Sequence, residues 1–169
     1  MWRAFELRPA PAPTLDPGGD YLRRVWRDSV YPLAERLGVT MRLPPLQPRS
    51  RLAHEAARWA RTRGRFDDYN AAVFRAFFER GEDIGTPSVL ISLATALGLD
   101  GDGLASALES HEFEPGVLED EGEAEALGVR GVPAFVANRR AALSGVQTAE
   151  NLRRLVERAR AQHDDPGGR

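Results

Sequence analysis

The chain of 169 residues has no cysteine, and all 23 of its basic residues are arginine, so lysine is absent as well. Without cysteine the chain can form no disulfide, supply no thiolate nucleophile and build no cysteine–zinc site. Without lysine it can form no Schiff base, because a guanidinium stays protonated and does not act as a nucleophile. Thiol chemistry and lysine Schiff-base chemistry are therefore excluded for the side chains of this sequence.

Long apolar runs and a strong charge of either sign are also missing. The longest apolar run is "VLISLA", Val89–Ala94, which is far too short to cross a bilayer. The net charge is −2 at pH 7, so no general attraction to nucleic acid or to an anionic membrane is expected. The first residues, "MWRAFELRPAP", lack the basic-then-apolar layout of a secretory signal. We therefore expect a cytoplasmic protein that binds neither nucleic acid nor membrane.

The pattern along the chain predicts a strand, a long helical block, a hairpin and a final helix. "WRAFEL", Trp2–Leu7, is the first strand expected, and helices follow from Asp20 to about Gly128. Two strands, "VPAFVA" (132–137) and "AALSG" (141–145), flank the turn "NRR", and Thr148 begins the last helix. Pro32 predicts a break near Tyr31. The predicted core of the helical block is apolar at helical spacing: Phe66, Val73, Phe74, Phe77, Leu90, Leu93 and Leu97.

Three polar groupings suggest chemistry at first sight, and each has a simpler explanation. "HEAAR", His54–Arg58, lacks the second histidine of the zinc-protease pattern H-E-x-x-H, and Arg58 would repel a cation. The acidic run from Glu119 to Glu125 lacks the alternating layout of a calcium loop, which favours a solvated helix face. The arginines of 49–65 spread around their helix rather than along one stripe. No metal site, cofactor or catalytic residue is predicted.

Several segments, taken in order, resemble one known family. They are "WRAFELRP", "AHEAARWARTRG", "FRAFFERGEDIG", "LATALGLD", "GVRGVPAFV" and "LSGVQTAENL". Together they resemble the DsbA-like family, most closely the FrnE-type branch that is grouped with 2-hydroxychromene-2-carboxylate isomerases. The resemblance implies an α/β fold: a thioredoxin-like sheet, incomplete at its N-terminal strand, with a large all-helical insertion. In that scheme residues 1–19 and 129–160 form the thioredoxin-like part, 20–128 form the mainly helical insertion, and 161–169 form a disordered tail.

The same resemblance implies a binding site at Gly131, Val132 and Pro133. Val132–Pro133 matches the family's cis-proline loop, where the exposed backbone before the proline pairs with an extended substrate. The implied partner is a polypeptide or a small-molecule thiol. Thiol–disulfide exchange needs an attacking thiolate and a resolving thiol, so this chain is predicted to be redox-inactive by itself. Two alternatives stay open: a cysteine-free protein that binds peptides or partners, and a glutathione-dependent isomerase-like protein with a pocket between sheet and insertion.

Members of the family carry a central strand and a C-x-x-C helix before the strand that "WRAFEL" resembles. We therefore expect in-frame codons upstream of Met1 to encode such a strand, followed by C-x-x-C or a serine variant. Failing that, a partner chain is expected to fill the gap, for instance in a homodimer.

Overall fold

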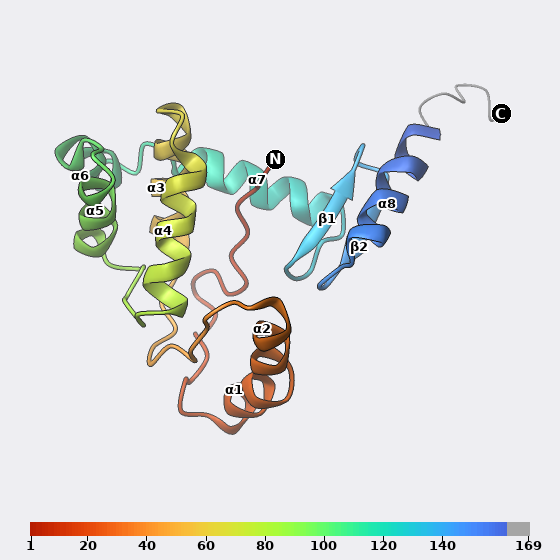
Figure 1. Cartoon of the computed structure of the whole chain (residues 1–169). Helices are drawn as coiled ribbons and strands as arrows, with labels where there is room; N and C mark the ends of the chain where they lie inside the picture. Colours follow the sequence, from red (N-terminus) through yellow and green to blue (C-terminus); the bar gives the residue numbers. More distant parts are fainter. Residues whose placement is uncertain (162–169) are drawn as a thin grey trace. The chain divides into compact units, whose positions relative to one another are not determined.

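The computed structural model describes residues 1–161. The chain divides into two compact units, Met1–Glu119 and Asp120–Arg169, with the boundary inside one helix (Figure 1). Part of the tail expected at 161–169 lies outside the described residues, since only Ala161, the last residue of the final helix, belongs to them.

The first helical stretch is interrupted where the proline predicted it. Helix α1 (Asp20–Val25) passes into a π-helical turn, η1 (Trp26–Val30), and then into α2 (Tyr31–Leu37), with Pro32 in the first turn of α2. Proline has no N–H for the regular i→i−4 pattern, and a widened turn before it accommodates that loss. The chain thus stays helical across Tyr31, and a π-helical turn stands where the break was expected.

The remaining helices of the first unit are α3 (Arg51–Thr62), α4 (Phe66–Phe78), α5 (Pro87–Ala96), α6 (Gly101–Glu109) and α7 (Glu114–Ala126), of which α7 continues into the second unit. Ser50 is the N-cap of α3, and Thr86 is the N-cap of α5, which begins at Pro87. Asp20 and Asp67 lie inside the first turns of α1 and α4, one and two residues after the N-caps Gly19 and Arg65. An acidic side chain there still interacts favourably with the helix dipole.

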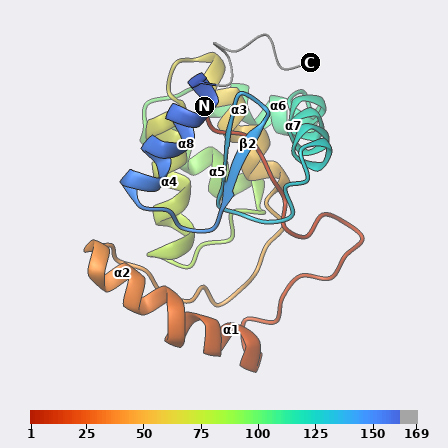
Figure 2. The same cartoon turned by 90° about the vertical axis from the view of Figure 1, so that its right-hand side faces the viewer.

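The core of the first unit forms where α3 packs against α4, α5 and α6 (Figures 1 and 2). The inward face of α3 consists largely of alanines, which let the neighbouring helices approach, with Trp59 filling the remaining space at 1% exposure. Val73, Leu90 and Leu93 are buried there as predicted, and Phe66, Phe77 and Leu97 pack against the core from its edge.

The prediction that Phe74 belongs to the core is wrong. Phe74 is 46% exposed, because the buried face of α4 is formed by Tyr69, Ala72, Val73 and Ala76. Its ring instead stacks on Phe78, with centroids 6.0 Å apart, and contacts Trp2 at 6.4 Å.

The strand expected at Trp2–Leu7 is also wrong. Residues 1–6 carry no regular secondary structure, and a strand exists only where a neighbouring strand accepts its hydrogen bonds. Arginine side chains hold the segment instead. Arg61 donates to the carbonyl oxygen of Trp2 at 3.0 Å, and Arg51 donates to the Glu6 carboxylate at 3.0 Å. The segment thus lies along the helices, with Ala4 and Glu6 buried.

The second unit contains an antiparallel hairpin and a covering helix. Strand β1 (Ala134–Ala137) pairs with β2 (Ala141–Ser144) in the register Phe135 opposite Leu143, and α8 (Ala149–Ala161) packs against both strands (Figure 1). Both strands and the start of α8 after Thr148 are confirmed, the strands being shorter than predicted. Leu155 and Ala159 of α8 are the side chains that this packing buries.

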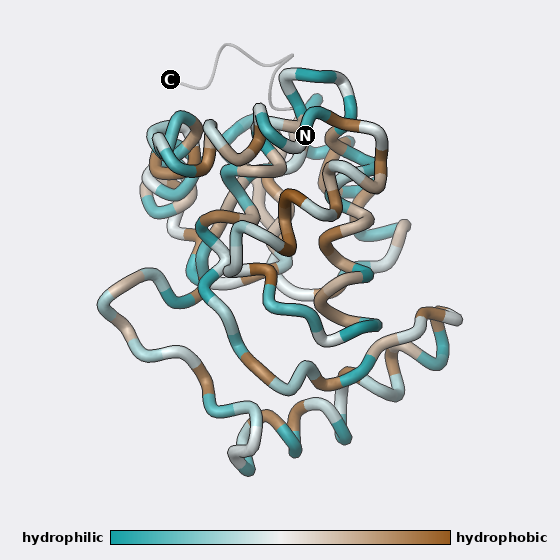
Figure 3. Tube along the Cα trace, turned by 90° about the vertical axis from the view of Figure 1, so that its left-hand side faces the viewer, coloured by the Kyte–Doolittle hydropathy of each residue, from teal (hydrophilic) through white to brown (hydrophobic). Residues whose placement is uncertain are grey.

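Apolar stretches of the chain are short and alternate with polar residues (Figure 3). Accordingly, no helix among residues 1–161 has the length and hydropathy needed to cross a bilayer.

Candidate functional site

The predicted binding residues lie in the loop that leads from α7 into β1. Helix α7 ends at Ala126, Gly128 follows with a φ of +71°, and the amides of Gly128 and Val129 donate back to the carbonyls of Glu125 and Ala124. This left-handed termination favours glycine and turns the chain away from the helix axis. Gly131, Val132 and Pro133 follow, and the Val132–Pro133 peptide bond is cis, as is Ala10–Pro11 elsewhere in the chain.

Val132 lies at the end of the hairpin and is 50% exposed. Within the described residues, the N–H and carbonyl of Val132 enter no hydrogen bond, whereas the next carbonyl, that of Pro133, accepts from the Gly145 amide at 2.8 Å. The regular pairing of the hairpin therefore ends one residue after Val132, which leaves Val132 with main-chain groups that can bind a ligand.

The opposite end of the hairpin is fixed by its turn and by α8. Asn138 and Arg139 have φ angles of +51° and +57°, and the Arg140 amide donates to the Ala137 carbonyl at 3.2 Å, the pattern of a type I′ turn. The Asn138 side-chain amide also donates to the Ala159 carbonyl at 3.0 Å. These contacts hold β1, and with it the loop that precedes β1, in place within the second unit.

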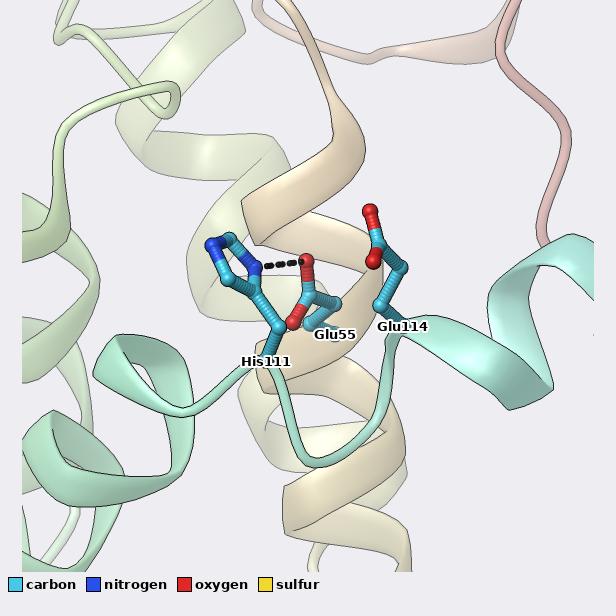
Figure 4. Close-up of side chains that lie close together, drawn as sticks. All are labelled: Glu55, His111 and Glu114. Atoms are coloured by element: carbon cyan, nitrogen blue, oxygen red, sulfur yellow. Dashed lines mark hydrogen bonds and ion pairs between the residues drawn. The ribbon is translucent and has the colours of Figure 1, made fainter.

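A second grouping of polar side chains lies in the first unit, at the junction of α3 with the turn between α6 and α7 (Figure 4). The Glu55 side chain is 1% exposed, and its Oε1 lies 3.4 Å from Nδ1 of His111. Glu114 lies beside them, so that one ligand atom from each of the three residues falls within 4.8 Å of the others. The second Glu55 oxygen, Oε2, is buried and has no hydrogen-bond partner within the described residues.

The position of His111 follows from how α6 ends. His111 has a φ of +51°, its amide donates to Leu108, and the next amide donates to Ala107. This is the arrangement in which glycine or asparagine usually terminates a helix. It reverses the chain so that the imidazole returns over α3, where it meets Glu55.

The electrostatics of Glu55 reflect its burial. Removal from water raises the pKa of the Glu55 carboxyl above its ordinary value, and the hydrogen bond from His111 opposes that rise in part. Nearby, the Arg51 guanidinium lies 3.3 Å from Glu114 and 3.0 Å from Glu6. Sequence reasoning considered "HEAAR" only for its histidine and missed Glu55, whose signal is a carboxylate at an inward position between alanines.

The other charged groupings have structural roles in the described residues. Asp120, within the acidic run expected to be solvated, is 2% exposed, so that expectation is wrong at this position. The arginines of 49–65 contact the chain itself: Arg49 donates to two carbonyls near the N-terminus, and the Arg63 guanidinium lies 3.8 Å from the Trp59 ring centroid.

Comparison with known proteins assigns the family. The model of the DSBA-like thioredoxin domain matches residues 1–157, so the chain belongs to the DsbA-like family. It is 40% identical over 116 residues to the uncharacterized protein YwbO of Bacillus subtilis (strain 168), a match that covers 67% of this chain and 58% of that protein. The crystal structure of the probable DsbA oxidoreductase SCO1869 from Streptomyces coelicolor superposes with a TM-score of 0.78 at 25% identity, over 95% of this chain and 74% of that one.

The fold is thus thioredoxin-like with a large helical part, as the resemblance implied. The chain spans a little over half the length of YwbO. Its sequence contains no cysteine, so the thiol chemistry for which DsbA-like oxidoreductases are named has no side chain here to carry it.

Proposed function

We propose that this chain contributes the polypeptide-binding part of a FrnE-type DsbA-like protein. In this proposal an extended, thiol-bearing polypeptide lies beside Gly131, Val132 and Pro133 and pairs with the Val132 main chain as an added strand would. The observation that carries the proposal is that Val132 is half exposed at the end of the hairpin and that its main chain is unpaired within the described residues.

Main-chain pairing suits a protein that must accept many sequences. Hydrogen bonds to N–H and carbonyl groups are available from any polypeptide, and specificity then comes from the side chains that point toward the surface. The exposed Val132 and Val136 side chains add apolar contact to such a surface. The chain carries out no disulfide exchange itself, and a thiol supplied from elsewhere would have to perform that step.

The test uses a short synthetic peptide with a central S-methylcysteine, which can bind but cannot exchange. Binding should shift the Val132 amide resonance in a ¹⁵N spectrum. N-methylation of the peptide amide that pairs with Val132 should weaken binding by up to about tenfold, the equivalent of one lost hydrogen bond. N-methylation of the next residue, whose amide faces away in an extended strand, is the matched control and should change little.

Equal weakening by both methylated peptides, or no shift at Val132, would contradict the proposal. Insulin reduction by this chain with dithiothreitol should not exceed the rate without protein, and turnover above that rate would refute redox inactivity. Saturable binding of glutathione without binding of the peptide would instead favour the isomerase-like alternative. The cytoplasmic location stays a prediction, which fractionation of the source cells would check.

A further inference from the structure

We propose that Glu55, His111 and Glu114 form a binding site for a zinc-like divalent cation, separate from the proline loop. All three residues belong to the first unit, and each comes from a different part of it: α3, the turn after α6 and the start of α7. The structure holds one nitrogen and two carboxylate groups within 4.8 Å of one another, which is the donor set of a mixed-ligand metal centre.

The buried Glu55 carboxylate is the observation that calls for a ligand. The side chain is 1% exposed, and its Oε2 atom has no hydrogen-bond partner within the described residues. Among residues 1–161 only Oε1 has a partner, His111, and a buried carboxylate whose lone pairs are partly unsatisfied is unfavourable. A cation held by Glu55 and Glu114 would compensate the negative charge of this buried carboxylate.

The geometry requires only small adjustments. Zinc–ligand distances of about 2.0–2.2 Å put tetrahedral ligand atoms about 3.4 Å apart, and the three candidate atoms lie within 4.8 Å of one another. The His111 side chain is 54% exposed and can rotate toward the two carboxylates. Three protein ligands would leave a position for water, and the imidazole favours zinc over magnesium or calcium, which prefer oxygen ligands only.

Arg51 is the neighbour that must be reconciled with a cation. Its guanidinium donates to Glu114 Oε1 at 3.3 Å and to Glu6 at 3.0 Å. A carboxylate has two oxygens, so Glu114 can keep the contact with Arg51 through one and bind the cation through the other. Hydrogen-bonded neighbours of this kind orient metal ligands. The positive charge of Arg51 lowers the affinity of the site for a cation. The Glu6 carboxylate contacts the same guanidinium and offsets part of that positive charge.

The experiment titrates Zn²⁺ into the tag-free chain after treatment with a chelator, using calorimetry and thermal unfolding. One equivalent should bind saturably and raise Tm, since an ion that binds only the folded state stabilises it. Mg²⁺ should bind far more weakly. His111→Gly suits the left-handed backbone and removes the imidazole, and it should weaken Zn²⁺ binding at least tenfold. Glu114→Gln should do the same.

Two variants serve as matched controls. Glu112→Gln removes a neighbouring carboxylate that is exposed and outside the group, and His163→Ala removes a histidine remote in sequence. Both should bind Zn²⁺ within about twofold of the parent chain, a difference well under 1 kcal/mol. The proposal is overturned if no saturable one-to-one binding occurs, if folded His111→Gly binds as tightly as the parent, or if His163→Ala abolishes binding.

Discussion

Tyr69 links two helices of the first unit through a single side chain. Its ring is fully buried on α4, and its hydroxyl donates to the Leu90 carbonyl of α5 at 2.9 Å. Burial raises the pKa of the Tyr69 phenol above its ordinary value, because the phenolate would lose its hydration.

The stability of the chain should therefore fall at alkaline pH. In the unfolded chain the Tyr69 phenol ionises near its ordinary pKa of about 10, whereas the folded state keeps the proton. The contribution is complete below about pH 10 and is lost as the pH rises above it, by up to about 1.4 kcal/mol per pH unit. The measurement is the free energy of urea unfolding on either side of that pH. Tyr69→Phe should show a shallower decline, whereas the exposed Tyr21→Phe should match the parent chain.

Individual side chains also show where sequence reasoning is limited. The periodicity located α4 correctly but assigned its aromatic residues to the core, and Phe74 instead lies on the surface. On α3 the buried positions are mostly alanines, with Glu55 and Trp59 among them, so a search for large apolar side chains does not locate this face. Which face is inward depends on how closely neighbouring helices approach, and that property comes from the packed structure rather than from one helix.

Among the elements, helix α6 has the clearest side-chain cap. Asp100 accepts a hydrogen bond from the Gly103 amide at 2.9 Å, whereas no side-chain hydrogen bond caps the start of α5 at Thr86. Asp100→Ala should reduce the free energy of unfolding by about 1 kcal/mol. Thr86→Ala is the corresponding change at an N-cap that makes no such bond. It should reduce the free energy of unfolding by only a few tenths of a kcal/mol. Chemical denaturation of both variants would decide, and equal losses would contradict the assigned role of Asp100.

The N-terminal segment is an element that arginines hold in place. Arg49 donates to the carbonyls of Arg8 at 2.8 Å and Ala12 at 2.9 Å. Arg49→Gln should free this segment, so that chymotrypsin cleaves after Phe5 several times faster, approaching the tenfold that 1.4 kcal/mol represents. Arg36→Gln, on the exposed face of α2, is the control and should leave the rate unchanged. A cleavage rate unaffected by Arg49→Gln would mean that the other contacts are enough to hold the N-terminal segment in place.

Element order was more predictable than pairing. Glycine and proline positions identified the helix ends, and alternation around "NRR" identified the hairpin. The pattern of Trp2–Leu7 also suits a strand, but strand formation depends on a partner elsewhere in the chain, which a local pattern does not contain. The candidate metal ligands come from separate elements, so no local motif could have grouped them. The loop at Val132 was singled out by its resemblance to the family's proline loop, and its binding role stays a prediction.

At the scale of the molecule, the two units differ in how much they bury. The first unit contains the cluster of buried apolar residues around α3, whereas the described part of the second unit buries chiefly Leu155 and Ala159 of α8. A small unit that buries little apolar surface is expected to have the lower stability. Local differences of this kind often produce separate unfolding steps.

This division has a spectroscopic consequence. Trp2, Trp26 and Trp59 all belong to the first unit, and residues 120–169 contain neither tryptophan nor tyrosine. Intrinsic fluorescence therefore reports on the first unit alone, whereas far-UV circular dichroism also detects α8 and the hairpin. During urea titration the dichroism should begin to change at lower urea than the fluorescence, and coincident curves would show one cooperative transition instead. A tryptophan introduced at the exposed Val146 would make the second unit visible, so that each half of the chain could be followed by its own light emission.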